Sequence, residues 1–141
     1  MVNDIIIGIS EKLKESYGDE CEIYTEQVAQ GLKGPTFSIS SVNSEEKPML
    51  GARHLRMNSF SVKYYPKSNA SPKAECNIVS DDLFLALQYI TVGGDLMQGT
   101  NMNSQFVDGV LEFMVNYDFF VQAVPENELM ESLLISNKAK G

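Results

Sequence analysis

The chain has 141 residues, of which 43% are hydrophobic and 21% are charged, and its formal net charge is −8. This composition is typical of a folded globular protein, excludes the low-hydrophobicity signature of a disordered chain, and suits a single domain. Because affinity for the phosphate backbone depends on clustered Lys and Arg, the acidic balance also argues against tight DNA binding.

No segment has the features of a membrane span or a secretory signal. The longest apolar cluster, Leu83–Ile90, contains Gln88 and is far shorter than the ~20 residues that a bilayer span needs. Asp4 and Glu11 interrupt the apolar N-terminal stretch, whereas a secretory signal needs a basic start and a longer apolar run. We therefore expect the protein to mature in the cytosol and to make no membrane contact.

The first predicted element is an amphipathic helix over residues 3–17. Asn3 or Asp4 can cap its first turn, and Gly18 stands where a left-handed C-terminal cap belongs. Apolar residues recur there every three to four positions, with polar residues between them: Ile5, Ile6, Ile9, Leu13 and Tyr17.

Three strands and a loop are predicted next. Cys21–Thr25 and Pro35–Ser40 are short β-prone runs, and residues 53–65 alternate between apolar and polar positions. The alternation slips at Asn58-Ser59, where a β-bulge would explain the change of frame. Residues Asn43–Ala52 are polar and lack periodicity, which predicts an exposed loop of the kind that often makes contacts.

A second amphipathic helix is predicted over residues 74–90, with Gly93-Gly94 ending it. Asp108-Gly109 is the strongest short-range hairpin signal, and it predicts a turn between the strands Asp95–Val107 and Val110–Ala123. The second of these strands places alternate apolar residues on one face, which should be the core face: Leu111, Phe113, Val115, Tyr117, Phe119 and Val121.

Phe120 falls on the face opposite this apolar stripe, where a large apolar side chain needs a cover. Residues 126–135, beyond Pro125, predict a short amphipathic helix. That helix is the favoured cover because local elements usually pack on each other, and a neighbouring subunit is the alternative. The candidate protein-interface residues are therefore Phe120, Leu129, Leu133, Leu134 and Ile135.

Together these elements predict an α+β fold: a twisted antiparallel β-sheet with two helices packed on one face, plus a short C-terminal helix. Residues 1–125 would form a single domain, and residues 126–141 would form a C-terminal helical extension.

The sequence offers no catalytic, cofactor-binding or metal-binding constellation. His54 has no serine or cysteine nucleophile motif beside it, and Gly93-Gly94 leads into a strand instead of the helix that follows a phosphate-binding loop. No Cys/His cluster has the spacing of zinc ligands, and Cys21 and Cys76 are more typical of buried thiols than of a disulfide in a cytosolic chain. We therefore expect a non-enzymatic protein without a cofactor.

The order of several short segments resembles the tail-terminator family of long-tailed, chiefly contractile, phages and related prophage elements. These segments span roughly residues 3–122, and none of them is a catalytic signature. They are Asn3-Asp4-Ile5-Ile6, Glu22–Glu26, Gln30–Lys33, Tyr64–Lys67, Gly99-Thr100, Val107–Leu111 and Val115–Asp118. The segment after Pro125 departs from this pattern, since it is longer and more helical than the family core.

The resemblance implies a structural protein of the virion tail, assembled in the host cytoplasm. Such a protein forms a ring, usually of six subunits, on the head-proximal end of the tail tube, stops polymerisation there and presents a docking surface to the neck of the filled head. Its implied partners are further copies of itself, the tail tube protein, neck or head-completion proteins and, in contractile tails, the sheath protein. The alternative is another head–tail joining or tube-like component of a virion or injection system.

An acidic lining would let DNA pass through such a ring without tight binding, because a basic lining would hold the duplex. The net charge of −8 suits this role. The candidate lumen or loop residues are Glu45, Glu46 and Asp95.

Overall fold

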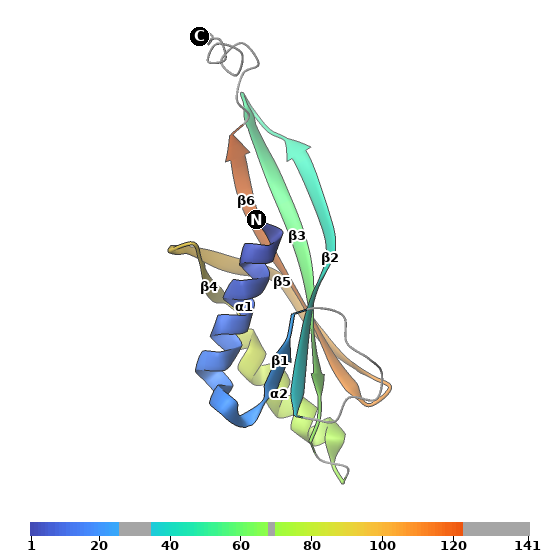
Figure 1. Ribbon diagram of the computed structural model, residues 1–141. Helices are drawn as coiled ribbons and strands as arrows, with labels where there is room; N and C mark the ends of the chain where they lie inside the picture. The colour runs from blue at the N-terminus through green and yellow to red at the C-terminus, as the bar shows by residue number, and fades with distance from the viewer. Residues whose placement is uncertain (26–34, 68–69, 123–141) are drawn as a thin grey trace. The chain divides into compact units, whose positions relative to one another are not determined.

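The computed structural model describes residues 1–25, 35–67 and 70–122 (Figure 1). The described strands form one six-stranded sheet in the order β1-β2-β3-β6-β5-β4. The elements, in chain order, are α1 (Val2–Tyr17), a 3-10 turn (Gly18–Glu20), β1 (Glu22–Tyr24), β2 (Thr36–Pro48), β3 (Arg53–Tyr65), α2 (Pro72–Ala86), β4 (Tyr89–Val92), β5 (Asp95–Val107) and β6 (Val110–Gln122).

The chain forms two compact units. The core unit comprises Met1–Ser44 and Asn58–Asp118. The ribbon unit comprises Glu45–Met57 and the chain from Phe119 onward, of which residues 119–122 are described. Long strands contribute to both units, because β2, β3 and β6 each continue from one into the other.

The first helix is confirmed. Three of its predicted apolar residues are fully buried in the core unit, namely Ile5, Ile9 and Leu13. Gly8 allows α1 to lie directly on β4, since a Cβ atom at this position would stand only 2.8 Å from the carbonyl oxygen of Thr91. The amphipathic pattern therefore identified both the helix and its buried face.

The second helix ends earlier than the prediction of residues 74–90, because α2 stops at Ala86 and the chain then enters β4. Gly93-Gly94 does not end a helix. It forms the turn between β4 and β5, where Val92 pairs with Asp95, and both glycines have positive φ. In the sequence, Leu87 and Ile90 extend the apolar stripe of the helix. Both are buried, but Ile90 lies in β4, where alternate residues of the strand are buried.

The hairpin at Asp108-Gly109 is confirmed. Val107 pairs with Val110, and Asp108 and Gly109 have φ angles of 53° and 80°. Two consecutive positive φ values are what a type I′ turn requires, so the Asp-Gly pair selects the turn that matches the twist of the strands. The predicted apolar stripe is buried from Leu111 to Tyr117, whereas Phe119 and Val121 are only half-buried.

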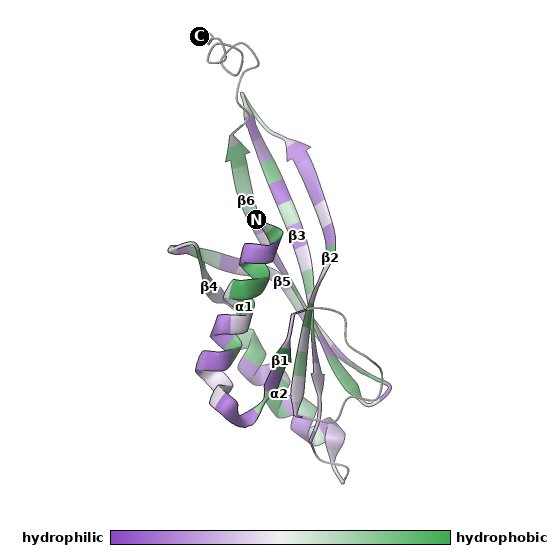
Figure 2. Cartoon of the chain, viewed as in Figure 1, coloured by the Kyte–Doolittle hydropathy of each residue, from purple (hydrophilic) through white to green (hydrophobic). Residues whose placement is uncertain are grey.

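The loop predicted over Asn43–Ala52 is wrong for most of its length. The strand β2 continues to Pro48, and only the four residues from Met49 to Ala52 turn the chain into β3. Every residue from Ser40 to Pro48 is exposed, and this stretch of β2 is largely hydrophilic in Figure 2. Since neither face of it is buried, its sequence lacks the apolar alternation from which a strand can be predicted.

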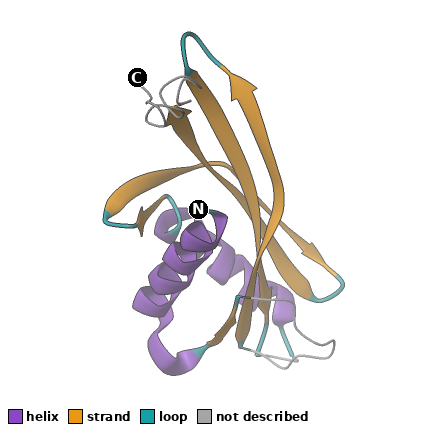
Figure 3. Ribbon diagram, turned by 45° about the horizontal axis from the view of Figure 1, so that its top comes forward, coloured by secondary structure: helices purple, strands orange, loops and turns teal. Residues whose placement is uncertain are grey.

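The predicted fold class is also wrong in its arrangement. The sheet is mixed and not antiparallel throughout, because β1 runs parallel to β2. The helices (Figure 3) contact different strands: α1 lies against β4 and β1, and α2 lies against β5. Alternation within a strand carries no information on the direction of its neighbour, so the parallel pair could not be inferred. The C-terminal helix expected over residues 126–135 lies outside the described residues.

Candidate functional site

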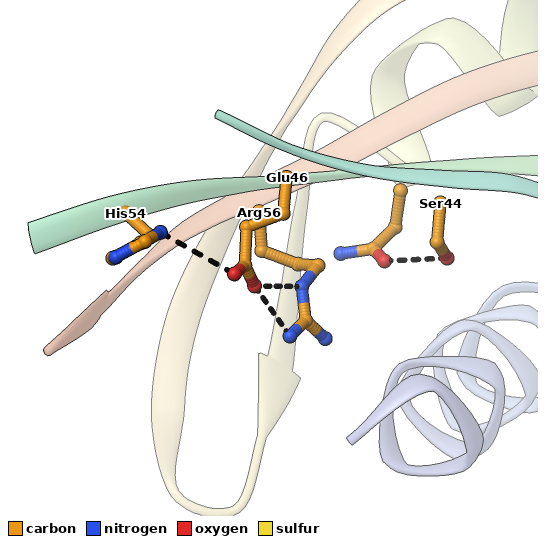
Figure 4. Close-up of polar contacts among 5 residues, drawn as sticks. Ser44, Glu46, His54 and Arg56 are labelled. Carbon is orange, nitrogen blue, oxygen red and sulfur yellow. Dashed lines mark hydrogen bonds and ion pairs between the residues drawn. The ribbon is translucent and has the colours of Figure 1, made fainter. Parts of the chain in front are cut away.

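The ribbon unit carries a charged cluster between β2 and β3. The Glu46 carboxylate accepts hydrogen bonds from Nε and Nη2 of Arg56 at 2.8 and 2.6 Å, both at its Oε1 atom (Figure 4). Its other oxygen, Oε2, lies 3.4 Å from Nδ1 of His54. These cross-strand contacts join the two strands, although the exposure of the groups limits their contribution to stability.

Each arginine of the ribbon unit lies over an aromatic ring of β6. The guanidinium carbon of Arg53 is 4.1 Å from the centroid of Phe120, and that of Arg56 is 5.9 Å from the centroid of Phe119. Successive strand residues point to opposite faces, so the ribbon presents an arginine–aromatic pair on both of its faces. Phe120 remains 54% exposed even with Arg53 above it. Arginine and aromatic side chains in such positions are typical of protein interfaces.

The turn between β2 and β3 ends the ribbon unit in exposed apolar side chains. Leu50 is 94% exposed and Met49 is 46% exposed. A hydrogen bond closes this turn, because the backbone N–H of Met49 donates to the carbonyl oxygen of Arg53 at 2.9 Å. A closed turn that projects an exposed leucine is a candidate contact point.

Asn58 forms a buried polar junction in the core unit. Its Oδ1 accepts a hydrogen bond from Ser44 Oγ at 2.9 Å (Figure 4), and its Nδ2 donates to the carbonyl oxygen of Tyr117 at 3.1 Å. Its backbone N–H donates to Oδ1 of Asp118 at 3.3 Å. Burial raises the pKa of Asp118, and the N–H of Asn58 offsets part of that effect. The predicted β-bulge at Asn58-Ser59 stays a prediction.

The core unit holds a pocket of about 430 Å³ lined by several titratable groups, including Tyr17, Cys21, Tyr64 and Glu75. The Tyr64 hydroxyl and the backbone N–H of Lys67 both donate to Oε2 of Glu75, at 2.5 and 2.7 Å. Burial, and after it the hydrogen bond to Glu75, raises the pKa of Tyr64, and burial also raises the pKa of Cys21. Both groups therefore stay protonated at neutral pH, and neither is an activated nucleophile.

The predicted site residues are distributed over both units. Phe120 lies exposed on β6, while Glu45 and Glu46 lie on β2 and not in a loop, with Glu46 paired to Arg56. Asp95 begins β5, directly after the Gly93-Gly94 turn. The remaining candidates lie outside the described residues: Leu129, Leu133, Leu134 and Ile135.

Three residues of the ribbon unit were not identified as candidates from the sequence, namely Leu50, Arg53 and Arg56. One available signal was that both arginines and the single histidine of the chain occur within residues 53–56. Such a concentration of cationic groups on an acidic chain indicates a functional segment, but its arginine–aromatic contacts depend on a strand about 65 residues away.

Among the residues that the structure describes, no helix is long and apolar enough to cross a bilayer. Within the same ranges, no three His, Cys, Asp or Glu side chains are grouped so that they could hold a metal ion.

The exposed arginine–aromatic pairs and the apolar tip are typical of a surface that contacts other proteins, as an assembly protein has. The sequence profile of the family described as "Phage tail terminator protein" matches residues 4–128, and the chain belongs to this family. It is a structural component of the virion tail, where it interacts with other tail components.

Comparisons with other proteins give weaker similarities. No curated protein matches the chain by sequence. One solved structure, of a protein without a functional name, is 13% identical, covers 89% of this chain and 99% of its own, and has a TM-score of 0.43. Another, described as "Virion of native gene transfer agent (GTA) particle", is 15% identical, covers 84% and 94% of the two chains, and has a TM-score of 0.45.

Proposed function

We propose that the protein forms a ring, of six subunits, that caps the head-proximal end of the tail tube, stops its polymerisation and offers a docking surface to the neck. The observation that carries this proposal is the match of residues 4–128 to the tail-terminator family. The tube protein and the neck or head-completion proteins are the proposed partners, together with the sheath protein if the tail contracts.

The exposed side chains of the subunit support an assembled state. Large hydrophobic residues are more than 60% exposed at several positions outside the ribbon tip, including Ile78, Leu85 and Leu96. A single exposed apolar residue needs no explanation, but the core unit exposes several of them, and the ribbon unit separately exposes its arginine–aromatic pairs. Several distinct contact areas are what a ring subunit needs, because it meets two neighbours as well as the tube and the neck.

We further propose that acidic side chains outnumber basic ones on the inner wall of the ring. The net charge of −8 supports an acidic conduit, through which DNA slides without being held. The proposed lining residues remain Glu45, Glu46 and Asp95. Of these residues, Glu46 is paired with Arg56, which offsets its charge. An assembled structure with a Lys-lined or Arg-lined channel would contradict this proposal.

The ring is tested by measuring the native mass of the purified protein alone and with tube protein. We expect a single closed oligomer, and tube polymerisation in its presence should stop at one ring in electron micrographs. Long stacks of the protein itself would instead indicate a tube-like component. A protein that stays monomeric with tube protein and leaves tube growth unchanged would overturn the proposal.

A further inference from the structure

The two arginines of the chain lie in the same unit. Both belong to β3 in the ribbon unit, whereas most of the described carboxylates lie in the core unit. Arg56 is neutralised by Glu46, but Arg53 has no carboxylate within ion-pair distance in the described part of the chain. Arg53 and the solvated Leu50 belong to the same short turn, which the Met49–Arg53 hydrogen bond closes. This hairpin tip therefore presents one apolar and one cationic side chain together.

A groove in the core unit offers the complementary pair. It has a volume of about 430 Å³ and is lined by residues of α1 and α2, among them Glu15, Asp82 and Leu85. Leu85 is 77% exposed. Asp82 and Leu85 are three residues apart on α2, so their side chains lie next to each other on one face of the helix.

The charges within the groove leave Asp82 available. Lys12 pairs with Glu15 at 3.6 Å, whereas Asp82 accepts only the hydroxyl of Tyr17, at 3.2 Å, among the described residues. A carboxylate that accepts one hydrogen bond has further lone pairs that can accept others. The groove is thus apolar at Leu85 and anionic at Asp82.

We propose that the hairpin tip of one subunit docks into the groove between α1 and α2 of a second copy of this chain, with Leu50 against Leu85 and Arg53 against Asp82. The inference rests on the proposed ring, and it names the contact that joins one subunit to the next. The hairpin tip and the groove are different surfaces of the same chain. Each subunit therefore donates one tip and accepts another, a head-to-tail contact that repeats around a closed ring.

Charge complementarity favours this groove over two other pockets of the core unit. The pocket beside Tyr64 has a similar volume, but its Glu75 already accepts two hydrogen bonds. The pocket beside Tyr89 and Leu96 has a volume of only about 150 Å³. Arg53 can also serve both contacts at once, because a guanidinium stacked on Phe120 still presents N–H donors at its edge.

The first test is charge reversal, read out as the native mass of the protein over a dilution series. We expect Arg53→Glu to weaken assembly at least about tenfold, since an interface arginine would then face Asp82 with like charge. Combining Arg53→Glu with Asp82→Arg should restore most of the loss. Lys73→Glu is the matched control, because it makes the same charge change at an exposed position of α2 outside the groove, and it should assemble like the wild type.

The second test is cross-linking in a Cys21→Ser background, which removes the partly exposed native thiol. A mixture of Leu50→Cys and Leu85→Cys single variants should form a disulfide-linked dimer of unlike chains under mild oxidation. If the wild type forms rings but this mixture gives no dimer and Arg53→Glu assembles normally, the docking inference is wrong while the ring stands. A wild type that never assembles would instead overturn the proposed function itself. In a variant that carries both Leu50→Cys and Leu85→Cys, a disulfide that forms only within one chain would show that the tip occupies the groove of its own chain, which also overturns the inference.

Discussion

The Asn58 side chain donates a hydrogen bond to the backbone carbonyl oxygen of Tyr117 at 3.1 Å, between residues that are 59 positions apart in the sequence. Asn58 is fully buried, its Oδ1 accepts a hydrogen bond from Ser44, and its backbone N–H donates to Asp118. A strand can hold a buried amide side chain when its polar atoms are hydrogen-bonded, as they are for Asn58. Removing the amide leaves its buried partners without a hydrogen bond.

We therefore expect Asn58→Ala to lower the free energy of unfolding by about 1–3 kcal/mol, because a buried carbonyl and a hydroxyl lose their partner. Urea denaturation followed by circular dichroism measures this change. Ser44→Ala is the matched control, which removes only one of the bonds and should cost about 0.5–1.5 kcal/mol. Equal stability of Asn58→Ala and the wild type would show that the junction contributes nothing to the fold.

The stability of the protein should respond to the titration of Asp118. Burial raises the pKa of this carboxyl above its ordinary value of 3.8, so the folded state holds the proton more tightly than the unfolded state does. The charged form therefore lowers the free energy of unfolding at neutral pH. This penalty disappears as the pH falls through the folded pKa, and below 3.8 both states are protonated.

The variant Asp118→Asn tests this dependence, since it keeps the Oδ1 acceptor for the Asn58 N–H and removes the titration. We expect it to be at least as stable as the wild type at pH 7, with the difference shrinking toward pH 4 in urea denaturation. The control is Asp95→Asn, at an exposed carboxylate. If Asp118→Asn is less stable than the wild type at pH 7 and gains stability relative to it toward pH 4, the sign of the shift is wrong.

The β5–β6 turn should depend on the absence of a β-branched residue at position 109. Gly109 has a φ of 80° and joins two strands whose partners Val107 and Val110 face each other. We expect Gly109→Val to lower the melting temperature by several degrees, because a β-branched residue at positive φ costs about 1–2 kcal/mol. Gly109→Asn should be tolerated better, since asparagine adopts positive φ more readily. Equal melting of the valine variant and the wild type would exclude a strained turn.

Elements with one buried face could be predicted from the sequence. The helix α1 and the strand β6 each bury a regular stripe of apolar residues, so the spacing of these residues in the sequence shows the period of each element. The polar half of β2 buries neither face, so its sequence pattern predicts a loop, although its backbone pairs with β3. The end of α2 was misplaced because Leu87 and Ile90 are both buried, one after the helix and one in β4.

The candidate site was predictable only in part. Phe120 stood out because a large apolar residue breaks the alternation of β6, and the structure leaves it exposed. Its contact with Arg53 could not be found, since no local pattern joins residues 67 positions apart. The sequence indicates Glu46 only by its charge. Its pairing with Arg56 depends on the register of the β2–β3 hairpin, and this register cannot be predicted when residues 43–48 are expected to be a loop.

The segment from Glu126 to Ile135, which lies outside the described residues, should act as an interaction element. Its five apolar residues exceed what a solvated stretch of ten residues would carry, and so short a helix is marginal alone in water.

We expect truncation after Pro125 to have one of two measurable effects on urea denaturation and ring formation. Loss of stability of the monomer would show that the segment packs on its own subunit, with the sheet face around Phe120 as the nearest apolar surface in sequence. A stable monomer that no longer forms rings or caps tubes would show a contact with a neighbour or the sheath, which could also bind by adding a strand to a sheet edge. Leu133→Ser in the full chain is the matched control, since it removes one apolar contact and keeps the length. If the truncated protein folds, forms rings and caps tubes like the wild type, the segment is dispensable and the prediction is wrong.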